Sequence, residues 1–198
     1  TGTTVASTSL AIAERTGASG RDVLAAMVLG YEAAGRIADA VMPAFKELGF
    51  HGSAIAIFGG AVASGHLLKL DAQQMAQAIA IAAVSMGGLA VAAETSVARE
   101  YFAGNAALLG VNAALMAQKG YVAEETVLEA RKGFFETYGG ADIESVTRGW
   151  GSAWDIITDM AIKLVPGGHP NHALGEAARS EEHTSELQSP YVISYAVF

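Results

Sequence analysis

Apolar residues recur at intervals of three and four along most of this chain, which is the spacing of one face of an α-helix. Val23, Met27, Ala34 and Ile37 form one such stripe. With the flanking residues, the spacing predicts helices over 4–15, 19–41, 53–68, 71–86 and 103–119, and shorter ones opening at 126, over 142–148 and over 170–178. Strands are nearly absent from the pattern. We therefore predict an all-α fold, a multi-helix bundle packed as one layered unit.

The expected helix ends carry local signals. Ser19-x-x-Asp22 and Asp71-x-x-Gln74 have the spacing of a capping box, in which two side chains satisfy backbone N–H groups reciprocally. Gly17 and Gly120 suit the left-handed position after a helix. The remaining expectations are loops over 42–52 and 88–102, capping of the 103–119 helix by Gly104 and Asn105, and a strand or extended connection over 160–165.

Composition narrows the class of protein. Hydrophobic residues make up 52% of the chain and aromatic residues 8%, so alanine supplies much of the apolar content and favours closely packed helices. The formal net charge is −8 and no basic run occurs, which argues against nucleic-acid binding. Cysteine is absent, so disulfides and thiolate chemistry are excluded.

No charged residue lies between Asp71 and Glu94, a length that could span a bilayer. Three glutamines and Ser85 interrupt the stretch, and Gly87-Gly88 would break it. Its apolar residues are mostly alanine, so the drive for insertion is weak. We interpret the stretch as a helix near the centre of a helical protein, and a membrane protein remains the alternative.

The last twenty residues have a different character. Residues 179–189 and 193–198 correspond to a translation of the two constant arms of a sequencing adapter, and 190–192 take the place of the index between them. We interpret 179–198 as a non-native tail and leave it out of the fold prediction. Because the chain also starts at Thr1 without a methionine, we expect a fragment cut at both ends.

Two motifs carry the candidate chemistry. His51 lies in a glycine-flanked turn before a helix that Ser53 is expected to cap, where an imidazole can bind a carboxylate or move a proton. Arg99 stands in a nearly uncharged stretch and can hold a carboxylate by two parallel hydrogen bonds. The alternatives are a surface-loop histidine and an ion pair of Arg99 with Glu94 or Glu100.

These motifs resemble those of the MmgE/PrpD family, whose pattern is Gly-Phe-His-Pro-Thr followed by Lys-x-x-His-x-Gly-x-Ala-Ala. The chain keeps His51, Gly104, Ala106 and Ala107. It has Gly52-Ser53 in place of Pro-Thr, Arg99 in place of the Lys and Phe102 in place of the second His. Proton transfer assigned to that second His therefore cannot be carried over. The resemblance runs from about residue 1 to residue 178.

A third segment, Lys163 to His172, resembles the family's Lys-x-x-Pro-…-His, and those two residues align. The alternative is a strand-edge lysine and a helix-capping histidine. The scattered His51, His169 and His172 lack metal-ligand spacing, and no acidic cluster completes a set, so we expect no metal. The resemblance implies catalytic roles for His51 and Lys163, and substrate-binding roles for Arg99, Ser53 and His172.

The resemblance also implies a helical domain, here 1–159, and a smaller α/β domain of which 160–178 is the start. It implies a cofactor-independent lyase, a dehydratase or decarboxylase of a small di- or tricarboxylate such as a 2-methylcitrate-like compound. A cytoplasmic homodimer without nucleic-acid or membrane partners is implied for the full-length enzyme, and we expect the fragment to be inactive.

Two alternatives stay open. One is an epimerase of an amino-dicarboxylate within the same family, and the other is a non-enzymatic helical or membrane protein whose motifs are packing features. A cluster of His51, Arg99 and Lys163 around one cleft would favour the enzyme.

Overall fold

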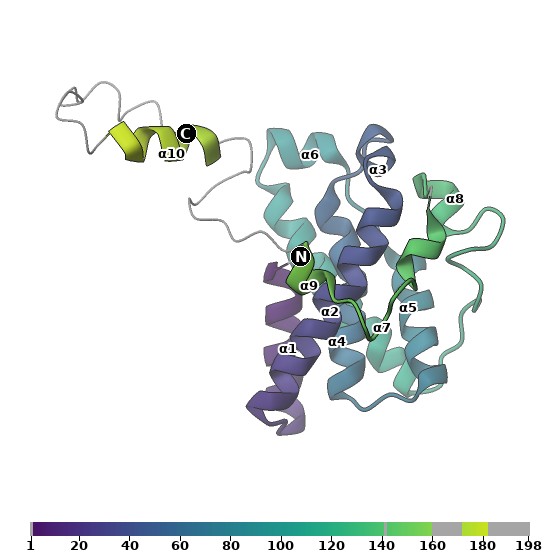
Figure 1. Ribbon diagram of the computed structural model, residues 1–198. Coiled ribbons are helices and arrows are strands. Elements are labelled where there is room, and N and C mark those ends of the chain that lie inside the picture. Colours follow the sequence, from purple (N-terminus) through teal and green to yellow (C-terminus); the bar gives the residue numbers. More distant parts are fainter. Residues whose placement is uncertain (1, 141, 160–171, 182–198) are drawn as a thin grey trace. The chain divides into compact units, whose positions relative to one another are not determined.

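The computed structural model describes residues 2–140, 142–159 and 172–181. The chain divides into two units, Thr1–Thr158 and Asp159–Phe198, and the second is described at Asp159 and over helix α10 (His172–Glu181). The first unit contains α1 (Gly2–Thr16), α2 (Gly20–Val41), α3 (Ala44–Glu47), η1 (Gly52–Ile55), α4 (Ala56–Leu67), α5 (Ala72–Ser85), α6 (Ala90–Thr95), α7 (Ala98–Gln118), α8 (Phe134–Tyr138), η2 (Ile143–Val146) and α9 (Asp155–Thr158). The described chain has no named strand, which confirms the predicted all-α fold (Figure 1).

Helix α4 is the centre of the first unit and packs against α1, α2, α5 and α7 (Figure 1). Eleven of its twelve residues are buried, because it is apolar around its whole circumference. The uncharged stretch 72–93 instead forms α5 and most of α6, and Val84 at the end of α5 is exposed. The most enclosed helix is therefore the one that precedes that stretch.

Glycines allow α2 and α7 to approach α4 closely. A Cβ atom on Gly59 of α4 would lie 2.7 Å from the carbonyl oxygen of Gly30 on α2. A Cβ atom on Gly110 of α7 would lie 2.8 Å from the carbonyl oxygen of Ile57. Both distances are shorter than van der Waals contact, so the backbones cross where a side chain would not fit.

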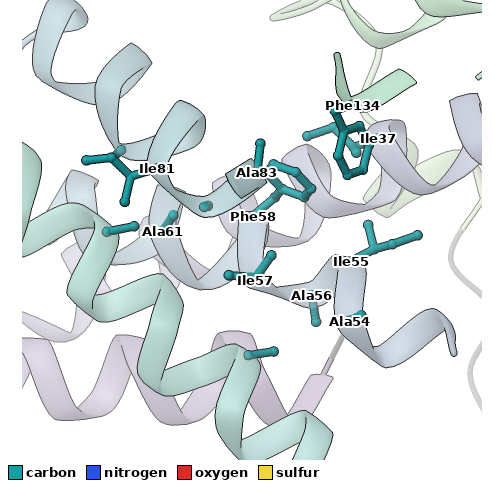
Figure 2. Close-up of a cluster of buried hydrophobic side chains, with 14 of the residues drawn as sticks. Ile37, Ala54, Ile55, Ala56, Ile57, Phe58, Ala61, Ile81, Ala83 and Phe134 are labelled. Atoms are coloured by element: carbon teal, nitrogen blue, oxygen red, sulfur yellow. The ribbon is translucent and has the colours of Figure 1, made fainter. Parts of the chain in front are cut away.

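The main core fills the space around the first turns of α4. Phe58 of α4 meets Phe134 of α8 edge to face, with ring centroids 5.1 Å apart. Figure 2 shows Ile37 beside this pair and Ile55, Ile57 and other small and branched side chains of the same cluster. The mixture of alanines with a few large side chains accounts for the high hydrophobic and low aromatic content of the sequence.

The local helix signals are largely confirmed. Both capping boxes form, with the hydroxyl of Ser19 accepting from the N–H of Asp22 and the carboxylate of Asp71 accepting from the N–H of Gln74. The hydrogen bonds from Ser19 lower the pKa of the Asp22 carboxyl. Gly17 and Gly120 have the left-handed backbone expected after α1 and α7.

Several expected connections are corrected by the structure. The 42–52 segment contains α3, and the 88–102 segment contains α6 and the first turn of α7. Gly104 and Asn105 therefore lie inside α7 and do not cap it. The helix expected to open at Thr126 is a series of turns, in which a Glu124 carboxylate oxygen accepts from the N–H and hydroxyl of Thr126. The 142–148 helix is the 3₁₀ turn η2.

A buried ion pair on α2 anchors the last part of the first unit. The Arg36 Nε atom donates to Glu32 Oε1 at 2.8 Å, and the two side chains are 4% and 1% exposed. The Glu32 carboxylate also accepts the N–H groups of Asp155 and Ile156 at 3.1 and 3.3 Å. These two donors lie at the start of α9, so the carboxylate caps that helix from another part of the chain.

The guanidinium of Arg36 satisfies carbonyl groups from the same region. Its Nη1 atom donates to the Arg148 carbonyl at 2.6 Å, and its Nη2 atom donates to the Ala153 carbonyl at 2.8 Å. The ring of Trp150 covers the group, with its centroid 5.2 Å from Cζ. One arginine therefore holds the irregular segment between η2 and α9 against α2.

Candidate active site

The turn that carries His51 is fixed from two sides. Phe50 packs its ring against those of Phe45 and Tyr138, with centroids 5.2 and 5.0 Å away. On the other side, the N–H of His51 donates to the Gly88 carbonyl at 3.1 Å, and Phe50 pairs with Leu89 in an isolated antiparallel bridge. The loop before α4 is thereby joined to the loop before α6, although the two are far apart in the sequence.

The His51 side chain has a capping role that the sequence analysis gave to Ser53. The Nδ1 atom of His51 accepts the N–H of Ser53 at 3.3 Å, so His51 caps the 3₁₀ turn η1. Ser53 lies inside that turn and is not the cap of α4. Because Nδ1 is an acceptor, the neutral imidazole carries its proton on Nε2.

The electrostatic surroundings favour this neutral form. Burial lowers the pKa of His51, the positive charges of Arg99 and Lys46 lower it further, and the Glu94 carboxylate opposes them. A neutral ring with its proton on Nε2 is a hydrogen-bond donor. His51 is therefore suited to donate to an oxygen atom that develops negative charge.

A pocket of about 600 Å³ lies beside His51. Arg99 reaches it from the first turn of α7, and Glu94 reaches it from α6. The complete lining consists of Lys46, Phe50, His51, Gly52, Ala90, Ala93, Glu94 and Arg99. The Arg99 side chain is 60% exposed, and its Nη2 atom lies 3.2 Å from the carboxylate of the neighbouring Glu100. Two cations, one carboxylate and one imidazole thus share a single opening.

The structure brings together some of the predicted site residues. His51 and Arg99 line the same pocket, whereas Ser53 contributes a backbone N–H to the histidine and does not line the pocket. Lys163 lies outside the described residues. His172 begins α10 in the second unit, so its relation to the pocket stays a prediction.

Two pocket residues and one neighbour of His51 were missed or undervalued in the sequence. Lys46 was not singled out, because it lies in a segment expected to be a loop. Glu94 was noticed as a nearby charge and not as a member of the site. Phe102, which replaces the histidine of the family pattern, lies with its ring centroid 6.5 Å from that of His51. The two motifs could have suggested this proximity, since the family pattern has histidine at both positions.

The sequence of the chain matches a known protein family. The N-terminal domain of the MmgE/PrpD family matches residues 1–145. The chain belongs to the MmgE/PrpD family. This family match and the described helices agree on a helical N-terminal domain.

Curated relatives include cis-aconitate decarboxylases. The chain is similar to the Aspergillus terreus cis-aconitate decarboxylase, with 34% identity over 156 residues, covering 74% of this chain and 32% of that protein. It is 31% identical over 192 residues to the cis-aconitate decarboxylase-like protein oryM of Aspergillus oryzae, covering 90% of this chain and 38% of that protein. It is 30% identical over 165 residues to the human cis-aconitate decarboxylase, covering 82% of this chain and 34% of that protein. The chain thus spans about a third of the length of these relatives.

In the described part of the chain, no three His, Asp or Glu side chains are grouped so that they could hold a metal ion. Among the described helices, none is both long enough and apolar enough to cross a membrane.

Proposed function

We propose that this chain is part of a cofactor-independent lyase, a dehydratase or decarboxylase that acts on a small di- or tricarboxylate. The observation that carries the proposal is that His51 and Arg99, which align with site positions of the family, line one pocket. The names of the relatives support the same substrate class. The cytoplasmic homodimer implied by the family resemblance belongs to this proposal.

The residues have distinct roles in the proposed reaction. Arg99 binds a carboxylate of the substrate through its planar guanidinium. When a proton leaves the carbon next to that carboxylate, negative charge develops on the carboxylate oxygens. The Nε2–H group of His51 then donates to one of these oxygens and stabilises the charge. The removed proton passes to a base, for which the Glu94 carboxylate lies in the pocket. In a dehydratase, the electron pair left on carbon expels the hydroxyl group, which takes up a proton and leaves as water. In a decarboxylase, CO₂ leaves, the base returns its proton to carbon, and water supplies one further proton that balances the lost carboxylate charge.

The remaining predicted residues are assigned by the resemblance. Lys163 is proposed as a second catalytic group, and His172 and Ser53 as substrate-binding groups. For Ser53 the structure supports an indirect contribution, since its N–H holds Nδ1 of His51. The epimerase alternative shares the proton-removal step and differs in the return of the proton, so this site favours neither outcome. The alternative of packing motifs without chemistry explains less, because the Arg99 side chain is largely exposed at the pocket.

Carboxylate binding by the chain tests the proposal. Isothermal titration with citrate, as a tricarboxylate probe, is expected to show binding that Arg99→Met weakens about tenfold, since a charge-assisted hydrogen bond is lost. Arg99→Lys is expected to restore part of this loss, because lysine lacks the planar fork. The matched control is Arg131→Met, which removes an exposed arginine that does not line the pocket. Equal citrate affinity in the Arg99→Met and Arg131→Met proteins would refute carboxylate binding by Arg99.

Turnover in an enzyme restored to full length tests His51 separately. His51→Asn is expected to lower kcat more than it raises KM, because the donated hydrogen bond strengthens as charge develops. Wild-type kcat in a folded His51→Asn enzyme would contradict the assignment.

A further inference from the structure

The pocket contains a second cation that the family motifs do not explain. Lys46 lies on the short helix α3, whereas Arg99 lies in the first turn of α7, so the two positive charges reach the pocket from different elements. Helix α3 is held in place by the neighbouring Phe45, which is fully buried and packs against the rings of Phe50 and Tyr138. The backbone of Lys46 is therefore fixed although its side chain is exposed.

The charge of Lys46 has no partner in the described chain. The Lys46 side chain forms no hydrogen bond or ion pair with another described residue, whereas Arg99 is already paired with Glu100. The charge nevertheless acts on the pocket, because it opposes protonation of His51. Glu94 lies in the same pocket and also forms no ion pair among the described residues.

We infer that Lys46 determines specificity by binding a second carboxylate of the ligand, while Arg99 binds the first. This inference rests on the proposed function in that it takes Arg99 as the first carboxylate contact. A ligand with two carboxylates can neutralise both cations at once, whereas a monocarboxylate leaves one cation without a partner. The Glu94 carboxylate repels a dicarboxylate more than a monocarboxylate, so the preference depends on the attraction of the second cation exceeding this repulsion. The pocket therefore selects dicarboxylates and tricarboxylates over monocarboxylates of similar size.

The ratio of two dissociation constants tests the inference. Succinate and butyrate have the same number of carbon atoms and differ in their number of carboxylates, and their binding to the chain can be followed by NMR titration. Wild-type protein is expected to bind succinate more tightly. Lys46→Met is expected to reduce the preference about fivefold, which is the upper range for an exposed ion pair. Lys46→Arg retains the charge and is expected to retain most of the preference.

A control and a second variant separate the possible outcomes. Lys119→Met makes the same charge change outside the pocket and is expected to leave the preference unchanged. If Lys46→Met leaves the preference at its wild-type value while Arg99→Met weakens both ligands, the role of Lys46 is refuted and the proposed function stands. If Arg99→Met leaves both affinities unchanged, the first contact and the proposed function fail. A wild-type protein without a preference for succinate also overturns the inference.

Discussion

The buried pair of Glu32 and Arg36 gives the sharpest prediction for the fold. Arg36→Met removes the guanidinium but keeps an unbranched apolar stem that can remain packed. The change leaves the Glu32 carboxylate, which is 1% exposed, with the N–H groups of Asp155 and Ile156 and without its cation. It also leaves the carbonyl groups that Arg36 satisfied without that donor.

The expected loss in the free energy of unfolding follows from this geometry. Breaking a buried ion pair by removing one partner costs about 3–5 kcal/mol, because the other charge stays buried without compensation. The backbone N–H groups of Asp155 and Ile156, which donate to the Glu32 carboxylate, compensate part of its charge. The expected loss from the broken pair therefore lies near the lower limit of this range. The unpaired carbonyl groups raise it by about 1 kcal/mol, because these hydrogen bonds are only part-buried and water replaces most of what is lost. We therefore expect Arg36→Met to lower the free energy of unfolding by about 4 kcal/mol.

Urea denaturation followed by circular dichroism measures this loss. Arg148→Met is the matched control, because Arg148 pairs with Asp142 at the surface, where both side chains are more than half exposed. Exposed pairs contribute at most about 1 kcal/mol, so this variant should unfold close to wild type. The double variant Glu32→Leu/Arg36→Met should recover part of the loss, since no charge remains buried. A loss below about 1 kcal/mol for Arg36→Met would refute the reasoning.

Two further predictions concern helix packing and the site histidine. Gly59→Ala should lower the free energy of unfolding by about 2 kcal/mol in urea denaturation, because the added Cβ would lie 2.7 Å from the backbone oxygen of Gly30. Gly35→Ala on α2 is the control and should stabilise the folded protein by about 0.5–1 kcal/mol, since no described atom beyond its own helix lies within 4 Å of the added Cβ. Equal losses of stability in both variants would contradict the packing argument. Because the pKa of folded His51 is lowered below 6.5, the unfolded chain binds the proton more readily. The stability attributable to His51 should therefore be complete above about pH 6.5 and should decline as the pH falls through the lowered pKa. Between about pH 7 and pH 5, the free energy of unfolding of the wild-type protein should decline more steeply than that of His51→Gln. Parallel curves of stability against pH would contradict the assigned direction of the pKa shift.

The long helices were predictable because their signals are local. The capping boxes at Ser19 and Asp71 and the apolar stripes mark α2 and α5 with little help from the rest of the fold. The short helices α3 and α6 have four and six residues, which is less than two turns, so periodicity cannot define them. The start of α7 was placed too late, because Gly104 resembles a helix boundary and in fact lies within the helix.

The site was predictable to a smaller extent. Family motifs indicated His51 and Arg99, and both line the pocket. The direction of the His51 side chain was not predictable, because the Nδ1 contact with Ser53 depends on the local 3₁₀ turn. Lys46 has no sequence signal at all. Its position depends on the burial of Phe45 and on the contact between the loops at Phe50 and Leu89, which are tertiary features.

Phe102 changes the chemistry that this pocket can support. The resemblance places a histidine there, and the phenylalanine ring instead lies beside His51 and covers Gly88, where a Cβ would be 3.6 Å from the ring. An aromatic hydrocarbon neither accepts nor donates a proton. Among the described residues that line the pocket, Lys46 and Arg99 are cations and His51 is a donor through Nε2, so Glu94 is the one group with a free basic oxygen. Any proton acceptor other than Glu94 must therefore come from outside the described lining, and Lys163, which we propose as a second catalytic group, is the candidate.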